Sequence, residues 1–100
     1  MAARYGGEEF ALILPETGLS EALQIAEAAR NAVVQMQIAH AKSSTAPYVS
    51  ISGGIAALLY NGNRSAEQLV MAADQCLYRA KRLGRNRNVA EPVALEQAMA

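Results

Sequence analysis

The sequence has no tryptophan, one phenylalanine, four tyrosines and a single cysteine. A single cysteine excludes an internal disulfide, which is compatible with a reducing cytoplasm as the location of the protein. We expect Cys76 to be a small buried hydrophobic residue on a helix. Because aromatic residues are scarce while hydrophobic residues make up 52% of the chain, the core is expected to consist of Ala, Leu, Ile, Val and Met.

The sequence also lacks an excess of charge and a long apolar run. Nine basic and nine acidic residues give a net charge of zero, which argues against binding to nucleic acid or to a membrane surface. No apolar run approaches the ~20 residues of a membrane-spanning helix, and no signal peptide is visible. The basic residues are unevenly spread, and five of the nine form a cluster at Arg79, Lys81, Arg82, Arg85 and Arg87.

The N-terminal region predicts a β-hairpin. Residues 10–14 form a short apolar run that Pro15 stops, which is typical of a buried strand. Gly6 and Gly7 precede this run and predict a tight turn, because glycine adopts backbone angles that other residues avoid. Residues 1–5 are then expected to be the partner strand.

The rest of the chain alternates between helix and strand patterns. We predict a helix over residues 20–41 capped by Ser20, a strand over 48–60, a helix over 65–83 ended by Gly84, and a short strand over 86–89. Residues 42–47 are a polar connection, and residues after Ala90 resemble a tail. This order predicts an α/β sandwich whose helices pack on a sheet.

Two features could carry chemistry. Glu8 and Glu9 are adjacent acids that repel each other, and a Mg²⁺ ion shared with nucleotide phosphates would relieve that repulsion. Two acids in a turn are also commonly just solvated. The spacing of Lys81 and Arg85 predicts one side of the last helical turn, together with Tyr78 and Asp74, and suits a polyphosphate. The alternative is that these cations only stabilise the helix dipole, by ~0.3–1 kcal/mol.

Three motifs together resemble the GGDEF domain of diguanylate cyclases. Residues 4–10 read RYGGEEF, like the GGDEF/GGEEF signature. Residues 50–56 read SISGGIA, like the family's S-x-G strand, although Gly53 stands where the family usually has a β-branched residue. Residues 73–86 read ADQCLYRAKRLGRN, matching the family's A-D-x-x-L-Y-x-A-K-x-x-G-R-N pattern. Their order and spacing make the resemblance specific over residues 2–89.

The resemblance implies a fold similar to nucleotidyl cyclase catalytic domains, with a mainly antiparallel sheet and flanking helices. Residues 1–89 would be the C-terminal larger part of the domain, and residues 90–100 a C-terminal tail. The family's first strand and helices, with a further metal-binding Asp and the guanine-reading residues, are not in this sequence. The isolated chain is therefore expected to be inactive.

The resemblance also implies a reaction, in which two GTP molecules on two facing domains condense to cyclic di-GMP with release of pyrophosphate. Glu8 and Glu9 would bind Mg²⁺ or Mn²⁺ and act in catalysis, with Glu8 as general base. The residues that would bind GTP phosphates are Gly6, Gly7, Lys81 and Arg85. Asp74 and Tyr78 are expected to be structural.

The expected partners are GTP, a second GGDEF domain and an upstream sensory or regulatory domain. The alternatives are a degenerate GGDEF module that binds GTP or cyclic di-GMP as a receptor, and an interaction domain with no nucleotide role. The intact acids Glu8 and Glu9 favour the cyclase.

Overall fold

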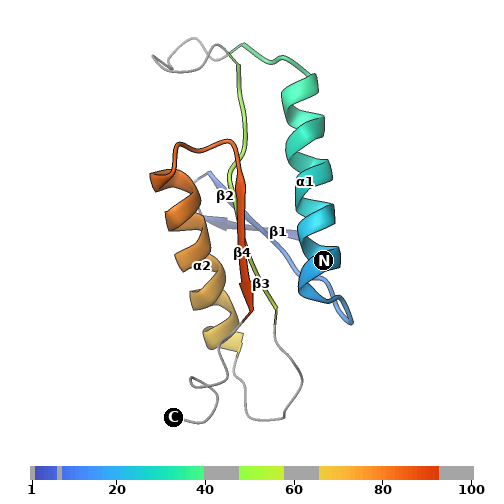
Figure 1. Cartoon of the computed structure of the whole chain (residues 1–100), viewed down its shortest axis with the longest axis vertical. Helices are drawn as coiled ribbons and strands as arrows, with labels where there is room; N and C mark the ends of the chain where they lie inside the picture. The colour runs from blue at the N-terminus through green and yellow to red at the C-terminus, as the bar shows by residue number, and fades with distance from the viewer. Residues whose placement is uncertain (1, 7, 40–47, 58–65, 93–100) are drawn as a thin grey trace.

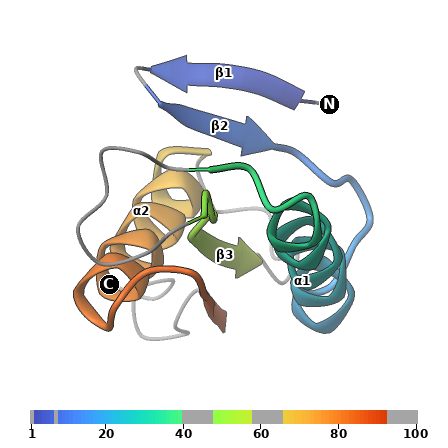
Figure 2. The same ribbon diagram turned by 90° about the horizontal axis from the view of Figure 1, so that it is seen from above.

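The structure, a computed structural model, describes residues 2–6, 8–39, 48–57 and 66–92. Its elements follow one another as β1 (Ala2–Gly6), β2 (Glu9–Leu12), α1 (Leu19–Gln35), β3 (Gly53–Ala57), α2 (Ala66–Arg82) and β4 (Asn88–Pro92) (Figure 1). Both helices pack against β3 and β4, and the β1–β2 hairpin lies apart from this layer (Figure 2). None of the described helices is both long enough and apolar enough to cross a membrane.

The predicted N-terminal hairpin is present. Strands β1 and β2 pair in antiparallel fashion, with Ala2 opposite Leu12 and Arg4 opposite Phe10. Strand β2 begins at Glu9 and ends at Leu12, two residues before the predicted end. Leu12, its last residue, pairs with Ala2 of β1.

The expectation of a mainly antiparallel sheet is wrong. The described strands form two separate two-stranded sheets, and the β3–β4 pair is parallel, with Gly53 opposite Asn88 and Ala57 opposite Pro92. The reason is the connection: α2 carries the chain back along the pair, so β4 starts at the same end as β3. The predicted alternation of helices and strands is thus correct, while the strand direction is not.

Helix α1 is shorter than the predicted helix over residues 20–41. Ser20 is not its cap, because Gly18 occupies that position and accepts a hydrogen bond from the Ala22 amide at 2.9 Å. The helix ends at Gln35, and Gln37 then adopts a left-handed conformation with φ 50°. The chain turns back there, since Ile38 accepts a hydrogen bond from Val49 at 2.7 Å.

The strands around α2 also differ from the prediction. Of the predicted strand over residues 48–60, only Gly53–Ala57 is a strand; Tyr48 forms an isolated bridge with Ala39, and residues 58–60 lie outside the described residues. Strand β4 starts two residues later than predicted because Asn86 is left-handed, with φ 48°. It continues to Pro92, and the division of the chain at residue 90 stays a prediction.

The tightest packing lies between α2 and β3. Cys76 and Ala80, both on α2, are the only hydrophobic residues fully buried within the described part of the chain. The expectation for Cys76 is therefore confirmed. A Cβ atom at Gly54 would collide with the Ala73 carbonyl oxygen and the Leu77 amide nitrogen of α2. Gly54 thus allows the backbone of β3 to approach the backbone of α2 directly.

We expect Gly54→Ala to lower the free energy of unfolding by about 3 kcal/mol or more, because backbone atoms cannot move aside as a side chain can. Urea unfolding followed by circular dichroism measures this loss. Gly18→Ala is the matched control, since a Cβ there meets nothing within 4 Å, and it should cost less than about 1 kcal/mol. Equal losses from the two substitutions would contradict the close approach.

Candidate functional site

The hairpin and the end of α2 meet at an ion pair. Glu9 is the first residue of β2, and Lys81 lies in the last turn of α2. The Lys81 Nζ atom is 3.5 Å from Glu9 Oε2, and the two side chains are 37% and 43% exposed. Two residues predicted to bind phosphate and metal are therefore neighbours, although they are far apart in the sequence.

The ion pair forms part of the wall of a hollow of about 250 Å³. The hollow is lined by Glu9, Asp74, Leu77, Tyr78 and Lys81. The predicted stripe of Asp74, Tyr78 and Lys81 on one side of α2 is thus confirmed. Whether Asp74 and Tyr78 have only structural roles stays a prediction, but both contribute to the walls of this hollow.

Glu8 lies in the turn before β2, and its side chain is exposed. Gly6 ends β1, and Gly7 lies outside the described residues. Of the hairpin residues that the structure describes, Glu9 and not Glu8 lines the hollow. The two carboxylates therefore occupy different environments, one open to solvent and one paired with a lysine.

The carboxylates of the hairpin fit a magnesium site that a nucleotide would complete. Within residues 2–6, 8–39, 48–57 and 66–92, no group of three or more His, Cys, Asp or Glu side chains could hold a metal ion. Magnesium, however, is usually bound through one or two carboxylates together with substrate phosphates. Glu8 and Glu9 supply oxygen donors of this kind.

Arg85 does not share a helical turn with Lys81, so that prediction is wrong. Helix α2 ends at Arg82 and Gly84 adopts φ 121°. The Gly84 amide donates to Lys81 O at 3.3 Å, and the Arg85 amide donates to Ala80 O at 2.9 Å. This pair of bonds is the Schellman motif, so the prediction that Gly84 ends the helix is confirmed. Arg85 lies in the following loop and is exposed.

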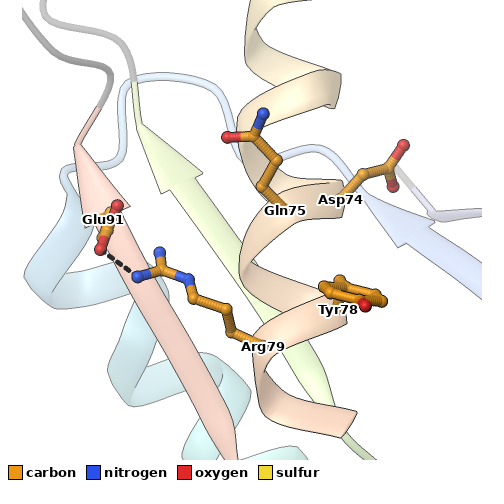
Figure 3. Close-up of a pocket in the computed structure, with 5 residues that line it drawn as sticks. All are labelled: Asp74, Gln75, Tyr78, Arg79 and Glu91. Atoms are coloured by element: carbon orange, nitrogen blue, oxygen red, sulfur yellow. Dashed lines mark ion pairs between the residues drawn. The ribbon is translucent and has the colours of Figure 1, made fainter. Parts of the chain in front are cut away.

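A second hollow, of about 520 Å³, lies beside the first and was not predicted. It is lined by Asp74, Gln75, Tyr78, Arg79 and Glu91 (Figure 3). Arg79 on α2 forms an ion pair with Glu91 on β4 at 2.6 Å. The Arg79 hydrogen bond holds the pKa of the Glu91 carboxyl below its usual range. No sequence pattern predicted this hollow, because Glu91 falls in the segment predicted to be a tail.

Comparison with known proteins shows similarity to one family over most of the chain. Residues 1–87 match the family described as "Diguanylate cyclase, GGDEF domain". The chain is 39% identical over 84 residues to "Diguanylate cyclase DosC" of Escherichia coli (strain K12), covering 84% of this chain and 18% of that protein. It is 44% identical over 87 residues to "Diguanylate cyclase DgcM" of the same strain, covering 87% of this chain and 20% of that protein.

A solved structure is also similar. It is described as the structure of the active GGEEF domain of a diguanylate cyclase from Vibrio cholerae, with a TM-score of 0.75 and 29% sequence identity. The match covers 89% of this chain and 54% of that chain. The chain thus spans about a fifth of the length of DosC and DgcM and about half of this domain.

We expect the Glu9–Lys81 pair to add little to the stability of the fold, because both side chains are partly exposed to solvent. A double-mutant cycle of Glu9→Gln and Lys81→Met, measured by urea unfolding, should give a coupling energy below about 1 kcal/mol. A coupling of several kcal/mol would instead identify the pair as a structural ion pair.

Proposed function

Because the chain belongs to the GGDEF family, we propose that it forms part of the catalytic domain of a diguanylate cyclase, which condenses two GTP molecules to cyclic di-GMP. The observation that carries the proposal is the meeting of Glu9 and Lys81 in one hollow. An acid suited to a metal ion and a cation suited to a phosphate are thereby brought side by side. An ion pair that is this exposed contributes little to the stability of the fold.

Lys81 and Arg85 bind the β- and γ-phosphates of GTP in this proposal. Lys81 contributes a compact point charge at the hollow, and Arg85 contributes a planar fork from the loop after α2. Phosphate oxygens entering the hollow replace Glu9 as the partner of the Lys81 ammonium. The Glu9 carboxylate then becomes available to a metal ion.

Glu8 and Glu9 are the groups that would hold Mg²⁺ or Mn²⁺, and Gly6 and Gly7 leave room for the phosphates beside the hairpin. The bound ion supplies neutralisation of charge on the phosphates. Glu8, exposed in the turn, is open to solvent and to a second substrate. It accepts the proton of the attacking 3′-hydroxyl as general base.

The reaction joins two copies of the domain, each holding one GTP. The 3′-oxygen of one GTP forms a bond to the α-phosphorus of the other, and the bond from that phosphorus to the bridging oxygen of pyrophosphate breaks. Lys81 and Arg85 hold the β- and γ-phosphates, which leave together as pyrophosphate. The 3′-oxygen of the second GTP then attacks the α-phosphorus of the first in the same way, which closes the ring and releases the second pyrophosphate.

The chain acts within a longer cytoplasmic protein in this proposal, with an upstream sensory or regulatory domain that controls the meeting of two catalytic domains. Its coverage of the relatives, 18% and 20% of their lengths, supports this view. The exposed apolar side chains of the hairpin, Phe10 at 77% and Leu12 at 54%, are consistent with further packing partners.

We expect Glu8→Gln in the full-length protein to lower kcat at least a hundredfold, because the amide cannot accept the 3′-hydroxyl proton. Lys81→Met should raise KM for GTP about tenfold through the loss of a charged phosphate contact. Chromatographic measurement of cyclic di-GMP formed from GTP and Mg²⁺ tests both effects. Glu21→Gln, an exposed acid in the first turn of α1, is the control.

The outcome also separates the cyclase from the alternatives. Calorimetric binding of GTP without product would favour a degenerate receptor module. The absence of both binding and product would favour an interaction domain and overturn the proposal.

The isolated chain should form no cyclic di-GMP under the same conditions, because the family's first-strand metal ligand and guanine-reading segments are not in its sequence. A measurable rate of synthesis by the 100-residue chain would contradict this expectation.

A further inference from the structure

Three consecutive residues after α2 have left-handed backbone conformations. Gly84 has φ 121°, Arg85 has φ 64° and Asn86 has φ 48°. Glycine adopts such angles freely and asparagine tolerates them, but arginine rarely does. Residues held in this region persist only where the surrounding structure fixes them, and they are frequent at ligand sites. The contacts that hold the Arg85 backbone therefore determine where its guanidinium lies.

Backbone and short side-chain contacts fix the loop on its β3 side. The Asn86 amide donates to Ser52 Oγ at 3.1 Å, and the Gly53 amide donates to the Arg87 carbonyl at 3.0 Å. Within the loop, Arg87 Nε donates to the Arg85 carbonyl at 3.1 Å. The backbone of Arg85 is thus held at its own carbonyl and through the two residues that follow it.

Helix α1 holds the loop through a chain of side chains. Arg30 Nη1 donates to Asn86 Oδ1 at 3.1 Å, and Arg30 Nη2 donates to Glu27 Oε2 at 3.1 Å. The other carboxylate oxygen, Glu27 Oε1, accepts a hydrogen bond from Asn88 Nδ2 at 2.7 Å. Glu27 thus joins the two ends of the segment from Asn86 to Asn88, where the loop becomes β4.

The surroundings of this network keep it ordered and charged. The Arg30 side chain is only 20% exposed. The hydrogen bond from Arg30, and to a smaller extent the one from Asn88, lowers the pKa of the Glu27 carboxyl, so this group is ionised at neutral pH. Gly53 leaves the necessary space, because a Cβ there would collide with Asn88 Oδ1. The network therefore spans α1, β3, β4 and the Arg85 loop.

We propose that Glu27 and Arg30 are positioning residues for GTP binding: they fix Asn86 and so hold Arg85 in the conformation that meets the phosphates. This inference rests on the proposed function, in which Arg85 is a phosphate ligand. Neither Glu27 nor Arg30 touches substrate. Their effect passes through Arg85 and reaches GTP binding rather than the proton transfer at Glu8.

The test is a double-mutant cycle of Arg30→Met and Arg85→Met in the full-length protein. Each substitution should raise KM for GTP about tenfold and change kcat less than about twofold, since Arg85 is proposed to hold phosphates away from the attacked α-phosphorus and to bind ground and transition states alike. The double variant should be no worse than Arg85→Met alone, because Arg30 acts through Arg85.

Arg79→Met is the matched control. Arg79, like Arg30, forms an ion pair with a glutamate. Its ion pair with Glu91 joins α2 to β4 and does not involve the loop. The KM of this variant for GTP should stay at the wild-type value. Melting temperatures of all variants show whether a change in KM follows from a general loss of stability, which would affect Arg30→Met and Arg79→Met alike.

A second measurement is independent of activity. Hydrogen exchange of the Asn86 amide should be at least tenfold faster in Arg30→Met and unchanged in Arg79→Met. Additive effects on KM, or exchange that Arg30→Met leaves unchanged, would overturn the positioning role. If the wild-type protein made no cyclic di-GMP while exchange changed as expected, the proposed function would fail and Arg30 would be an anchor of the loop only.

Discussion

The close approach of α2 to β3 at Gly54 is the constraint on which the rest of the structure depends. A side chain there would push the helix away from the strand, because it would meet the backbone at Ala73 and Leu77. With glycine at this position, α2 packs directly on β3 and β4. Cys76 and Ala80 of α2 are the two hydrophobic residues that are fully buried in the described part of the chain. The position of α2 in turn determines where its last turn meets the hairpin.

Local signals in the sequence predicted much of this arrangement. The hairpin, α2 and the end of α2 at Gly84 depend on nearby residues, and all three are found. The direction of β3 relative to β4 depends on pairing between distant segments, which a periodic pattern does not encode. The position of Arg85 was missed for a related reason: helical spacing applies only while the helix continues, and it stops at Arg82.

The candidate site was predictable in its chemistry and less so in its geometry. Motif residues Glu9 and Lys81 meet, as the combined motifs suggested, while Glu8 points into solvent from the turn. The unusual Gly53 has a physical explanation that the sequence did not offer. It provides the space that the Asn88 side chain fills on its way to Glu27, so one small residue in β3 permits a link between α1 and β4.

The basic cluster near the end of α2 shows how a chain with no net charge can still offer a cation to a ligand. Lys81 pairs with Glu9 and Arg79 with Glu91, Arg82 lies over the Tyr78 ring, and Arg87 donates to a backbone carbonyl. Within the part of the chain that the structure describes, the Arg85 guanidinium has no such partner. Its backbone is nevertheless held in a left-handed conformation, with its amide donating to Ala80 O and its carbonyl accepting from Arg87 Nε. Because the loop is already fixed, a ligand that accepts hydrogen bonds from this guanidinium would not have to order the backbone on binding.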